Sequence, residues 1–363
     1  MGPLEFLYYI GYSLKKSLSL KARERLPSEV ISIGNITVGG TGKTPAVIAL
    51  AERAMDSGFL PCILTRGYGG KAKGPCLVST TNGSALSAEE AGDEALLMAT
   101  RLRSVPIVKG KNRYEAGLFA LDHLKKEAMD LEKRTIFILD DGFQHWRLFR
   151  DIDVLLIDST NPFGNGKLLP SGTLREPLRE IVRADVIVVT KTAVSSSRLP
   201  GTSHSFSDRS GLFRDLSASE GRLYSLTAEV RRYNPDAPIF LSEHVPSHLS
   251  TPSGTRLPVE TLMGKEVFGF CGIGNPQQFR EMIEHLSGSL KGFVSYRDHH
   301  RFTGKDVTKI VDYAKELGTD WIVTTEKDIM RLAIFDLPEN LFALGIEFYV
   351  EEGFYDYILR RPE

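Results

Sequence analysis

The chain has 363 residues, of which 42% are hydrophobic and 25% are charged. This composition excludes a disordered, collagen-like or many-pass membrane protein, and the length predicts about two domains. The 45 basic and 46 acidic residues leave a net charge of -1, so we expect no nucleic acid partner. The 3 cysteines form no CxxC pair, which argues against a disulfide framework or a cysteine zinc site and favours a reducing compartment.

The first 27 residues predict a helix of their own, which Pro27 ends. Its apolar stretch at 4–14 contains Glu5 and is far shorter than the roughly 20 residues that span a bilayer. Apolar and aromatic residues at helical spacings are followed by the basic cluster Lys15, Lys16, Lys21, Arg23 and Arg25. Such an amphipathic helix suits a membrane interface with anionic headgroups. A terminal helix packed on the neighbouring domain explains the pattern equally well.

The region from Val30 to Lys191 predicts an α/β domain with a parallel sheet. Nearly continuous Val, Ile and Leu runs are typical of strands covered on both faces. We expect strands at 30–34, 61–69, 105–110, 135–141, 153–158 and 185–191, and helices at 45–57, 88–103 and 113–126. Polar residues follow each strand, and ligands of such sheets bind at the carboxyl ends of the strands.

The composition changes after Lys191. Segments 194–221 and 241–258 are rich in Ser, Pro and Gly and predict loops, with a pair of strands at 221–233 between them. A second, smaller α/β domain is expected from Lys265 onward, with helices at 276–286 and 306–317. The predicted organisation is therefore a helix at 1–27, a domain at 28–205 and a second domain at 206–363.

The strongest motif is the glycine-rich segment between Gly34 and Thr44, GNITVGGTGKT. Glycines let the backbone wrap an anion, and the helix that follows adds its positive end. The motif departs from GxxxxGK[ST] because Thr37 replaces the first glycine. Lys43 is expected to reach the terminal phosphates of a nucleotide and Thr44 to ligate Mg²⁺. The predicted nucleotide contacts are Thr37, Val38, Gly39, Gly40, Thr41, Gly42, Lys43 and Thr44. The alternative is a glycine-rich turn without a ligand.

A second element, the strand at 135–141, ends in Asp140 and Asp141. One aspartate there is commonly part of a turn, but two carboxylates in a chain with a phosphate loop predict a Mg²⁺ site. The sequence does not support a guanine-reading motif, which has the pattern Thr/Asn-Lys-x-Asp. The nearest match is Thr190-Lys191-Thr192, and it is followed by Ala193 where the motif has aspartate. ATP is the expected nucleotide by elimination.

Further polar clusters follow other predicted strands. Singly they are typical of helix caps or solvated loops, but together they would place Arg66, Lys111, Arg113 and Arg175 around one anionic pocket. The segment 293–302 contains adjacent histidines after Asp298. It is either a surface turn or a group suited to proton transfer near neutral pH.

These motifs, taken in order, resemble one family. GNITVGGTGKTP, TRGYG, AGDE, KNRYEAG, DDGFQH, LPSGTLREP, FVSYRDHHRF and TTEKD resemble the tetraacyldisaccharide 4'-kinases, the lipid A 4'-kinases of Gram-negative bacteria. The resemblance extends from the N-terminal helix to about Leu332. The phosphate-loop motif of that family also has threonine in place of the first glycine, as Thr37 is here. It implies a P-loop NTPase-like domain with a second α/β domain closing the active-site cleft. The implied reaction is phosphoryl transfer from ATP to the 4'-hydroxyl of a tetraacylated glucosamine disaccharide 1-phosphate. The implied location is the cytoplasmic face of the inner membrane, as a peripheral protein without an obligate protein partner.

The resemblance also implies roles for individual residues. Asp93 corresponds to the catalytic carboxylate and His299 to its partner, with His300 as the alternative. Arg113 and Arg175 correspond to basic residues around the transferred phosphate, beside the phosphate-binding Lys43. The implied metal site consists of Thr44, Asp140 and Asp141, with Gln144 close to it.

A membrane-bound switch ATPase is the competing hypothesis. It shares the phosphate loop and the amphipathic end, but its nucleophile would be water, and Asp93 and His299 would have no use in sugar chemistry.

Overall fold

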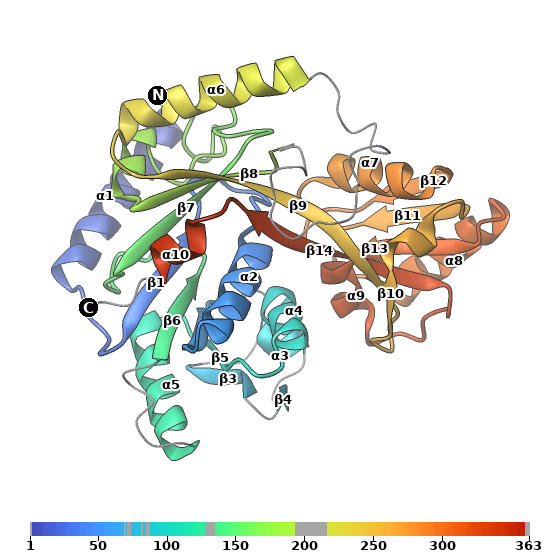
Figure 1. Ribbon diagram of the computed structural model, residues 1–363, viewed down its shortest axis with the longest axis horizontal. Coiled ribbons are helices and arrows are strands. Elements are labelled where there is room, and N and C mark those ends of the chain that lie inside the picture. Colours follow the sequence, from blue (N-terminus) through green and yellow to red (C-terminus); the bar gives the residue numbers. More distant parts are fainter. Residues whose placement is uncertain are drawn as a thin grey trace. The chain divides into compact units, whose positions relative to one another are not determined.

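The computed structural model describes residues 2–68, 70, 74–80, 83–84, 88–127, 135–192 and 216–359. They belong to two compact units (Figure 1). Of the described residues, unit 1 contains those up to 192 together with 216–243 and 348–359, and unit 2 contains 244–347. The chain passes between the units along β9 (Ile239–Ser250) and β14 (Leu341–Val350).

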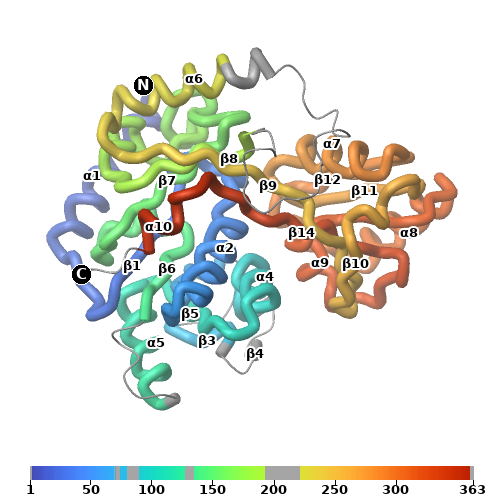
Figure 2. Tube along the Cα trace, in the orientation of Figure 1, coloured from blue at the N-terminus to red at the C-terminus, as the bar shows by residue number. Residues whose placement is uncertain are grey.

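This division differs from the expected boundaries at 1–27, 28–205 and 206–363. Helix α1 (Pro3–Lys21) belongs to unit 1, and the end of the chain returns to unit 1 after β14, as the red end of the tube in Figure 2 shows. The return has a packing reason, because Phe348, Phe354 and Ile358 are buried in the same apolar cluster as Ile31 and Val154. Most of the Ser-rich segment at 194–221 lies outside the described residues.

The sheet of unit 1 has the strand order β9-β8-β7-β1-β6-β2-β5-β3-β4. All neighbours from β9 to β5 are parallel, whereas β3 runs antiparallel to both β5 and β4. The strands are β1 (Glu29–Gly34), β2 (Leu60–Thr65), β3 (Cys76–Thr80), β4 (Gly83–Ser84), β5 (Ile107–Lys109), β6 (Thr135–Asp140), β7 (Ile152–Asp158) and β8 (Val186–Thr190). The sequence prediction of a parallel sheet is confirmed.

Helices cover both faces of this sheet, so alternate strand residues enter different apolar clusters. Ile31, Ile63 and Ile138 pack with one group of helices: α2 (Lys43–Asp56), α4 (Asp93–Arg101) and α10 (Phe354–Ile358). Their neighbours in sequence pack on the opposite face with α5 (Arg113–Glu127) and α6 (Leu216–Tyr233). The helix expected at 88–103 is interrupted at Gly92, whose φ of 94° separates α3 (Ala88–Ala91) from α4.

Helix α6 corrects the strand pair expected at 221–233. Leu223, Leu226, Val230 and Tyr233 are spaced three or four residues apart, which is the period of a helix face. Leu226 and Val230 are buried in the core of unit 1, with the other two partly buried beside them. The helical period was present in the sequence, but the polar residues between these positions obscured it.

Unit 2 is built on a smaller sheet with the strand order β12-β11-β13-β14-β9. Its strands β11 (Val267–Cys271), β12 (Leu290–Ser295) and β13 (Trp321–Thr325) are parallel neighbours. Helix α7 (Pro276–Ser287) packs on one face, and α8 (Gly304–Glu316) and α9 (Glu326–Leu332) pack on the other. The predicted second α/β domain is therefore present.

The loops expected at 241–258 are wrong for most of that segment. It forms the long strand β9 and the short antiparallel β10 (Arg256–Pro258), followed by a 3₁₀-helix at Val259–Leu262. Pairing with β8, β10 and β14 stabilises β9 despite its Ser and Pro residues. Within the described part of the chain, we find no helix with the length and apolar character needed to cross a bilayer.

Candidate active site

The phosphate loop connects β1 to α2. Gly39 and Gly42 have φ values of 121° and 88°, a conformation that glycine adopts without strain. The loop is tied to its surroundings, because the N–H of Val38 donates to the carbonyl of Thr173 at 2.8 Å and Thr190 Oγ1 donates to the carbonyl of Thr41 at 3.1 Å. The N-terminus of α2 follows directly, and its unpaired N–H groups and positive end suit an anion.

Lys43, the first residue of α2, already contacts the other half of the site. Its Nζ donates to Asn35 Oδ1 at 3.1 Å and lies 3.6 Å from Asp141 Oδ1. Burial lowers the pKa of Lys43, and the charge of Asp141 opposes that effect. Asn35 is itself buried and donates to the carbonyl of Thr37 at 2.7 Å, so it links the lysine to the loop.

Asp140 and Asp141 lie at the carboxyl end of β6. This strand is a parallel neighbour of β1, and Asp140 pairs with Ile33 one residue before the end of β1. Thr65 Oγ1 donates to Asp140 at 2.8 Å, and Arg175 Nη1 donates to both carboxylate oxygens of Asp141 at 2.9 Å. Asp141 has a φ of 51°, an uncommon conformation for a residue other than glycine and one often found at functional sites.

The two carboxyls differ in acidity because their neighbours differ. Burial, together with the charges of Glu94 and Asp141, raises the pKa of Asp140 to about 6. Burial acts in the same direction at Asp141, but the charges of Lys43 and Arg175 hold its pKa below the usual value. Negative charge is therefore incompletely compensated around Asp140.

These side chains fit a magnesium ion. Carboxylate and hydroxyl oxygens are the donors that Mg²⁺ prefers, and a cation beside Asp140 would compensate the excess negative charge. Thr44 is buried in the first turn of α2, directly after Lys43. Among the described residues, no three His, Cys, Asp or Glu side chains cluster so that they could hold a metal. Mg²⁺ usually takes part of its coordination from nucleotide phosphates and water.

Arg113 and Arg175 flank the carboxylate pair. Arg113 is buried, with Nη1 donating to the carbonyl of Gly110 at 2.7 Å and Nη2 3.5 Å from the carbonyl of Asp140. Burial lowers the pKa of Arg113 to about 10, so the side chain stays charged at neutral pH. Of the other predicted basic residues, Arg66 is close enough to affect the same pKa, whereas Lys111 is exposed.

The segments TRGYG and AGDE pack against each other. A Cβ at Gly92 would lie 2.5 Å from the carbonyl oxygen of Tyr68, so only glycine fits at this contact. Asp93 follows Gly92 as the first residue of α4 and is partly exposed. The neighbouring Glu94 acts electrostatically on both Asp140 and Lys43, which places the start of α4 near the carboxyl end of β6.

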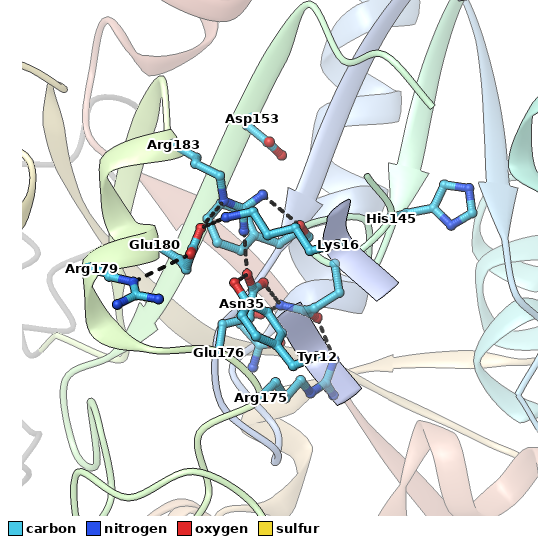
Figure 3. A network of polar contacts seen from close by, with 12 residues as sticks. Tyr12, Lys16, Asn35, His145, Asp153, Arg175, Glu176, Arg179, Glu180 and Arg183 are labelled. Atoms are coloured by element: carbon cyan, nitrogen blue, oxygen red, sulfur yellow. Dashed lines mark hydrogen bonds and ion pairs between the residues drawn. The ribbon is translucent and has the colours of Figure 1, made fainter. Parts of the chain in front are cut away.

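Gln144 and Glu176 connect the site to helix α1. Figure 3 shows Glu176 with Tyr12 of this helix. Gln144 Nε2 donates to the carbonyl of Asn35 at 2.7 Å and to Glu176 at 2.6 Å, and its Oε1 accepts from Arg175 at 3.3 Å. Both ends of this amide therefore have protein partners, and metal binding by Gln144 stays a prediction. Glu176 is fully buried and also accepts from Arg183 at 2.7 Å and from the phenol of Tyr12 at 3.3 Å.

Helix α1 packs on unit 1 with its polar side. The phenol of Tyr8 donates to the carbonyl of Arg175 at 2.9 Å, Lys16 pairs with Glu180, and Glu5 accepts from the N–H of Leu168 at 2.9 Å. The apolar side faces outward, since Leu4, Leu7, Leu14 and Leu18 are 60–66% exposed. The two interpretations of this helix are therefore compatible, because the helix is packed on the domain and still presents an apolar stripe.

In unit 2, the adjacent histidines have different surroundings. His300 stacks on Tyr296, with ring centroids 4.7 Å apart, and its Nε2 lies 3.3 Å from Asp306 in the capping box of α8. His299 has a φ of 57°, and its Nδ1 lies 3.2 Å from Arg331 Nη2. The contacts of His300 are those of a structural residue, which favours His299 as the functional one. Asp93 and His299 belong to different units.

The family model for tetraacyldisaccharide-1-P 4'-kinase matches residues 1–363. The tetraacyldisaccharide 4'-kinase of Syntrophus aciditrophicus is 37% identical over 361 residues, which cover 97% of this chain and 90% of that protein. The one from Halothermothrix orenii is 33% identical over 368 residues, covering 96% and 88%. This chain belongs to the tetraacyldisaccharide 4'-kinase family.

A solved member of this kinase family has the same fold. The crystal structure of LpxK from Aquifex aeolicus in complex with ATP matches with a TM-score of 0.69 and 32% identity, over 98% of this chain and 95% of that one. The sequence prediction of both family and fold is confirmed.

Several residues of the kinase site were missed by sequence reasoning. Asn35, Thr65, Glu94 and Glu176 each contact or act on a predicted site residue. Each lies inside one of the quoted motifs, and this location was the sequence signal that could have identified it. The partners of Thr65, Glu94 and Glu176 lie in other motifs, however, and polar residues at strand ends are common in any α/β protein.

Proposed function

We propose that the site around Lys43, Asp141 and Arg175 transfers the γ-phosphoryl group of ATP to the 4'-hydroxyl of a tetraacyl glucosamine disaccharide 1-phosphate. This is the reaction for which the family is named, and it belongs to lipid A biosynthesis. One observation carries the proposal: Asp141 lies 3.6 Å from Lys43 of the phosphate loop and accepts hydrogen bonds from Arg175. This contact joins a phosphate cradle, a carboxylate pair and a guanidinium, the groups that phosphoryl transfer requires.

In this proposal, the nucleotide binds along the phosphate loop. The loop N–H groups and Lys43 hold the phosphates, with contacts along Thr37, Val38, Gly39, Gly40, Thr41, Gly42 and Thr44. Thr44, Asp140 and Asp141 would hold Mg²⁺, which would neutralise and orient the phosphates. Moving Lys43 from Asn35 and Asp141 toward the phosphates would remove one of the two cationic side chains that contact Asp141, while Arg175 would stay. Arg113 and Arg175 stabilise charge on the transferred group.

The acceptor hydroxyl needs a base, and we assign that role to Asp93 and His299 acting as one unit. The O–H bond breaks, the proton goes to this unit, and the hydroxyl oxygen bonds to the γ-phosphorus. The bond from that phosphorus to the bridging oxygen breaks, and ADP leaves. Within this unit, His299 is the proposed partner of Asp93.

The protein meets its substrate at a membrane surface in this proposal. Four acyl chains hold the acceptor in a bilayer, because each methylene moved into water costs about 0.8 kcal/mol. The exposed leucines of α1 and the basic residues around its end, including Lys15 and Lys21, form a surface that suits an anionic bilayer. We therefore place the kinase peripherally at the cytoplasmic face of the inner membrane.

The test is to incubate the purified protein with ATP labelled in its γ-phosphate and a tetraacyl disaccharide 1-phosphate in mixed micelles. Label should appear in the lipid and should depend on that acceptor. The Lys43→Ala protein serves as the matched control. Release of free phosphate without lipid labelling would instead favour the switch ATPase.

A further inference from the structure

We propose that Gln144 is a positioning residue, whose side-chain amide holds the Arg175 guanidinium in an orientation that the buried Glu176 enforces. The inference rests on the proposed function and deepens it, because it concerns how Arg175 is presented to the transferred phosphate. It gives Gln144 a role other than the metal contact predicted from the sequence.

The partners of Gln144 determine which way its amide points. Nε2 lies 2.7 Å from the carbonyl oxygen of Asn35 and 2.6 Å from Glu176 Oε1, and both of these oxygens accept hydrogen bonds. Arg175 Nη1, which can only donate, lies 3.3 Å from Gln144 Oε1. Turning the amide by 180° would place its oxygen against two acceptors and its NH₂ group against a donor. One orientation of the amide therefore satisfies all three contacts.

Glu176 enforces this orientation because its carboxylate is held as an acceptor. The residue is fully buried, and its other oxygen accepts from Arg183 Nη2 at 2.7 Å and from the phenol of Tyr12 at 3.3 Å (Figure 3). Burial raises the pKa of Glu176, but the charge of Arg183 and the hydrogen bond from Gln144 act against that rise. With three donors directed at its two oxygens, Glu176 accepts at Oε1, so Gln144 donates there.

Arg175 is fixed at its backbone and directed at its tip. Its N–H donates to the carbonyl of Ile36 at 2.7 Å, and its own carbonyl accepts from the phenol of Tyr8 at 2.9 Å. At the tip, Nη1 donates to Asp141 at 2.9 Å and to Gln144 at 3.3 Å. Gln144 is the neutral one of these two partners, so it directs the guanidinium without cancelling the positive charge that the transferred phosphate requires.

The same amide connects to the cation of the phosphate loop. The Asn35 carbonyl accepts from Gln144, and Asn35 Oδ1 accepts from Lys43 Nζ at 3.1 Å. Gln144 is therefore bonded to Arg175 directly and to Lys43 through Asn35. Its oxygen is the atom of the amide that Mg²⁺ could bind, but a metal there would share a neutral acceptor with a guanidinium, and the two positive charges would repel.

The test exchanges donor and acceptor. Gln144→Glu places a carboxylate oxygen where the NH₂ group was, opposite Glu176 and the Asn35 carbonyl. We expect a lower melting temperature without nucleotide or Mg²⁺, and a kcat lowered roughly 10- to 100-fold, the scale on which misplacing a catalytic group lowers turnover. Adding Glu176→Gln supplies an NH₂ group that donates to the new carboxylate, so the double variant should recover part of both values. A metal ligand predicts no such rescue, because a carboxylate would bind Mg²⁺ at least as well as an amide.

The matched control is Gln277→Glu in α7. Gln277 Nε2 donates to Glu281 at 2.8 Å, so this substitution also opposes two carboxylates, but at an exposed site. Its kcat and melting temperature should be close to those of the natural protein.

A second series tests whether Gln144 acts through Arg175. Gln144→Met removes the amide and keeps the length of the side chain, so it should lower kcat while KM for ATP changes little. In the Arg175→Ala background, the same substitution should cost little further kcat, because effects of residues that act as a unit are strongly non-additive. A merely structural glutamine would lower the melting temperature and multiply the loss in kcat. If Gln144→Glu does not fold, this series decides the question.

Three results would overturn the inference. They are full turnover of Gln144→Glu at a lower Mg²⁺ requirement, no rescue of that variant by Glu176→Gln, and losses that multiply in Gln144→Met with Arg175→Ala. Each of them leaves the proposed function intact, provided that Arg175→Ala alone is impaired. A fully active Arg175→Ala protein would remove Arg175 from the proposed function, and this inference would fail with it.

Discussion

The phenol of Tyr12 in helix α1 donates a 3.3 Å hydrogen bond to the fully buried carboxylate of Glu176, which is 164 residues away in the sequence. Glu176 in turn accepts from Gln144, and Gln144 accepts from Arg175. A continuous set of hydrogen bonds therefore runs from the helix proposed to meet the membrane to the arginine that contacts Asp141.

This relationship predicts that Tyr12→Phe lowers kcat. The substitution removes only the hydroxyl. The ring keeps its edge-to-face contact with Trp146, in which the ring centroids are 5.5 Å apart. Losing one buried hydrogen bond costs about 1 kcal/mol, which corresponds to about a fivefold loss in kcat if it is felt fully at Arg175. Tyr9→Phe is the matched control. The Tyr9 hydroxyl accepts a hydrogen bond from the exposed Arg179 side chain, which is not a member of this set. Equal turnover in the two variants would show that α1 and the site are independent.

Lys43→Ala tests the phosphate loop. A fixed positive charge on the phosphates is worth most in the transition state, so we expect kcat to fall by at least about 10²- to 10³-fold. The fold should persist, because Asp141 keeps its hydrogen bonds from Arg175. Lys126→Ala is the control, at a lysine that is 71% exposed on α5. Near-normal turnover of Lys43→Ala with an unchanged melting temperature would refute the assignment of the loop.

The apolar stripe of α1 predicts membrane binding that can be separated from folding. A triple variant, Leu7→Ser with Leu14→Ser and Leu18→Ser, removes side chains that are 60–66% exposed, so thermal stability should stay unchanged. Binding to anionic vesicles should weaken on the order of 100-fold or more, since each leucine contributes about 1.5 kcal/mol or more when buried. Deleting residues 1–26 is a poorer test, because it also removes Glu5 and Tyr12.

The control for the stripe is Ile334→Ser in unit 2, at a side chain that is 80% exposed. It should bind vesicles like the natural protein in a sedimentation assay. If the triple variant also sediments normally, the stripe does not contact the bilayer.

Asp93 and His299 are predicted to act as one unit. Asp93→Ala should lower turnover at saturating ATP by about 10²- to 10⁴-fold, the usual contribution of a general base. Removing both residues should cost little more than removing the worse one, because effects within a catalytic unit are strongly non-additive. His300→Ala is the control and should remain active, since His300 has structural contacts with Tyr296 and Asp306. Losses that simply multiply in the double variant would indicate independent roles.

The packing of α1 is predicted to depend on pH through the carboxyl of Glu180. Burial acts to raise the pKa of Glu180, but hydrogen bonds from Lys16 and Tyr12 hold it below the usual 4.5. A carboxyl with a lowered pKa in the folded state contributes stability above its unfolded pKa and loses it as the pH falls through the folded pKa. Glu180→Gln should therefore reduce the urea midpoint most near neutral pH, with the difference shrinking below pH about 4.5. The exposed Glu339→Gln should show no such trend, and a difference independent of pH would contradict the prediction.

The local elements of this protein were predictable because their signals are contiguous. The buried strands β1, β6, β7 and β8 are short apolar runs, and the loop before α2 combines glycines with Lys43 and Thr44. The strand β9 and the helix α6 were missed for the opposite reason. Their polar composition resembles that of loops, and burial against unit 1 or pairing with distant strands stabilises them.

The sequence by itself determined the family and the nucleotide loop, because these depend on motifs that are contiguous in the chain. It also predicted Asp140, Asp141, Arg113 and Arg175 as site residues, through the motifs that resemble that family. Only the tertiary structure decided what these residues touch. Parallel pairing of β1 with β6 brings Lys43 to Asp141, and the packing of α1 brings Tyr12 to Glu176. The fold likewise assigns Arg331 to His299 and Asp306 to His300. Contacts between residues far apart in the chain arise from packing of whole elements, and a single sequence carries no local signal for them.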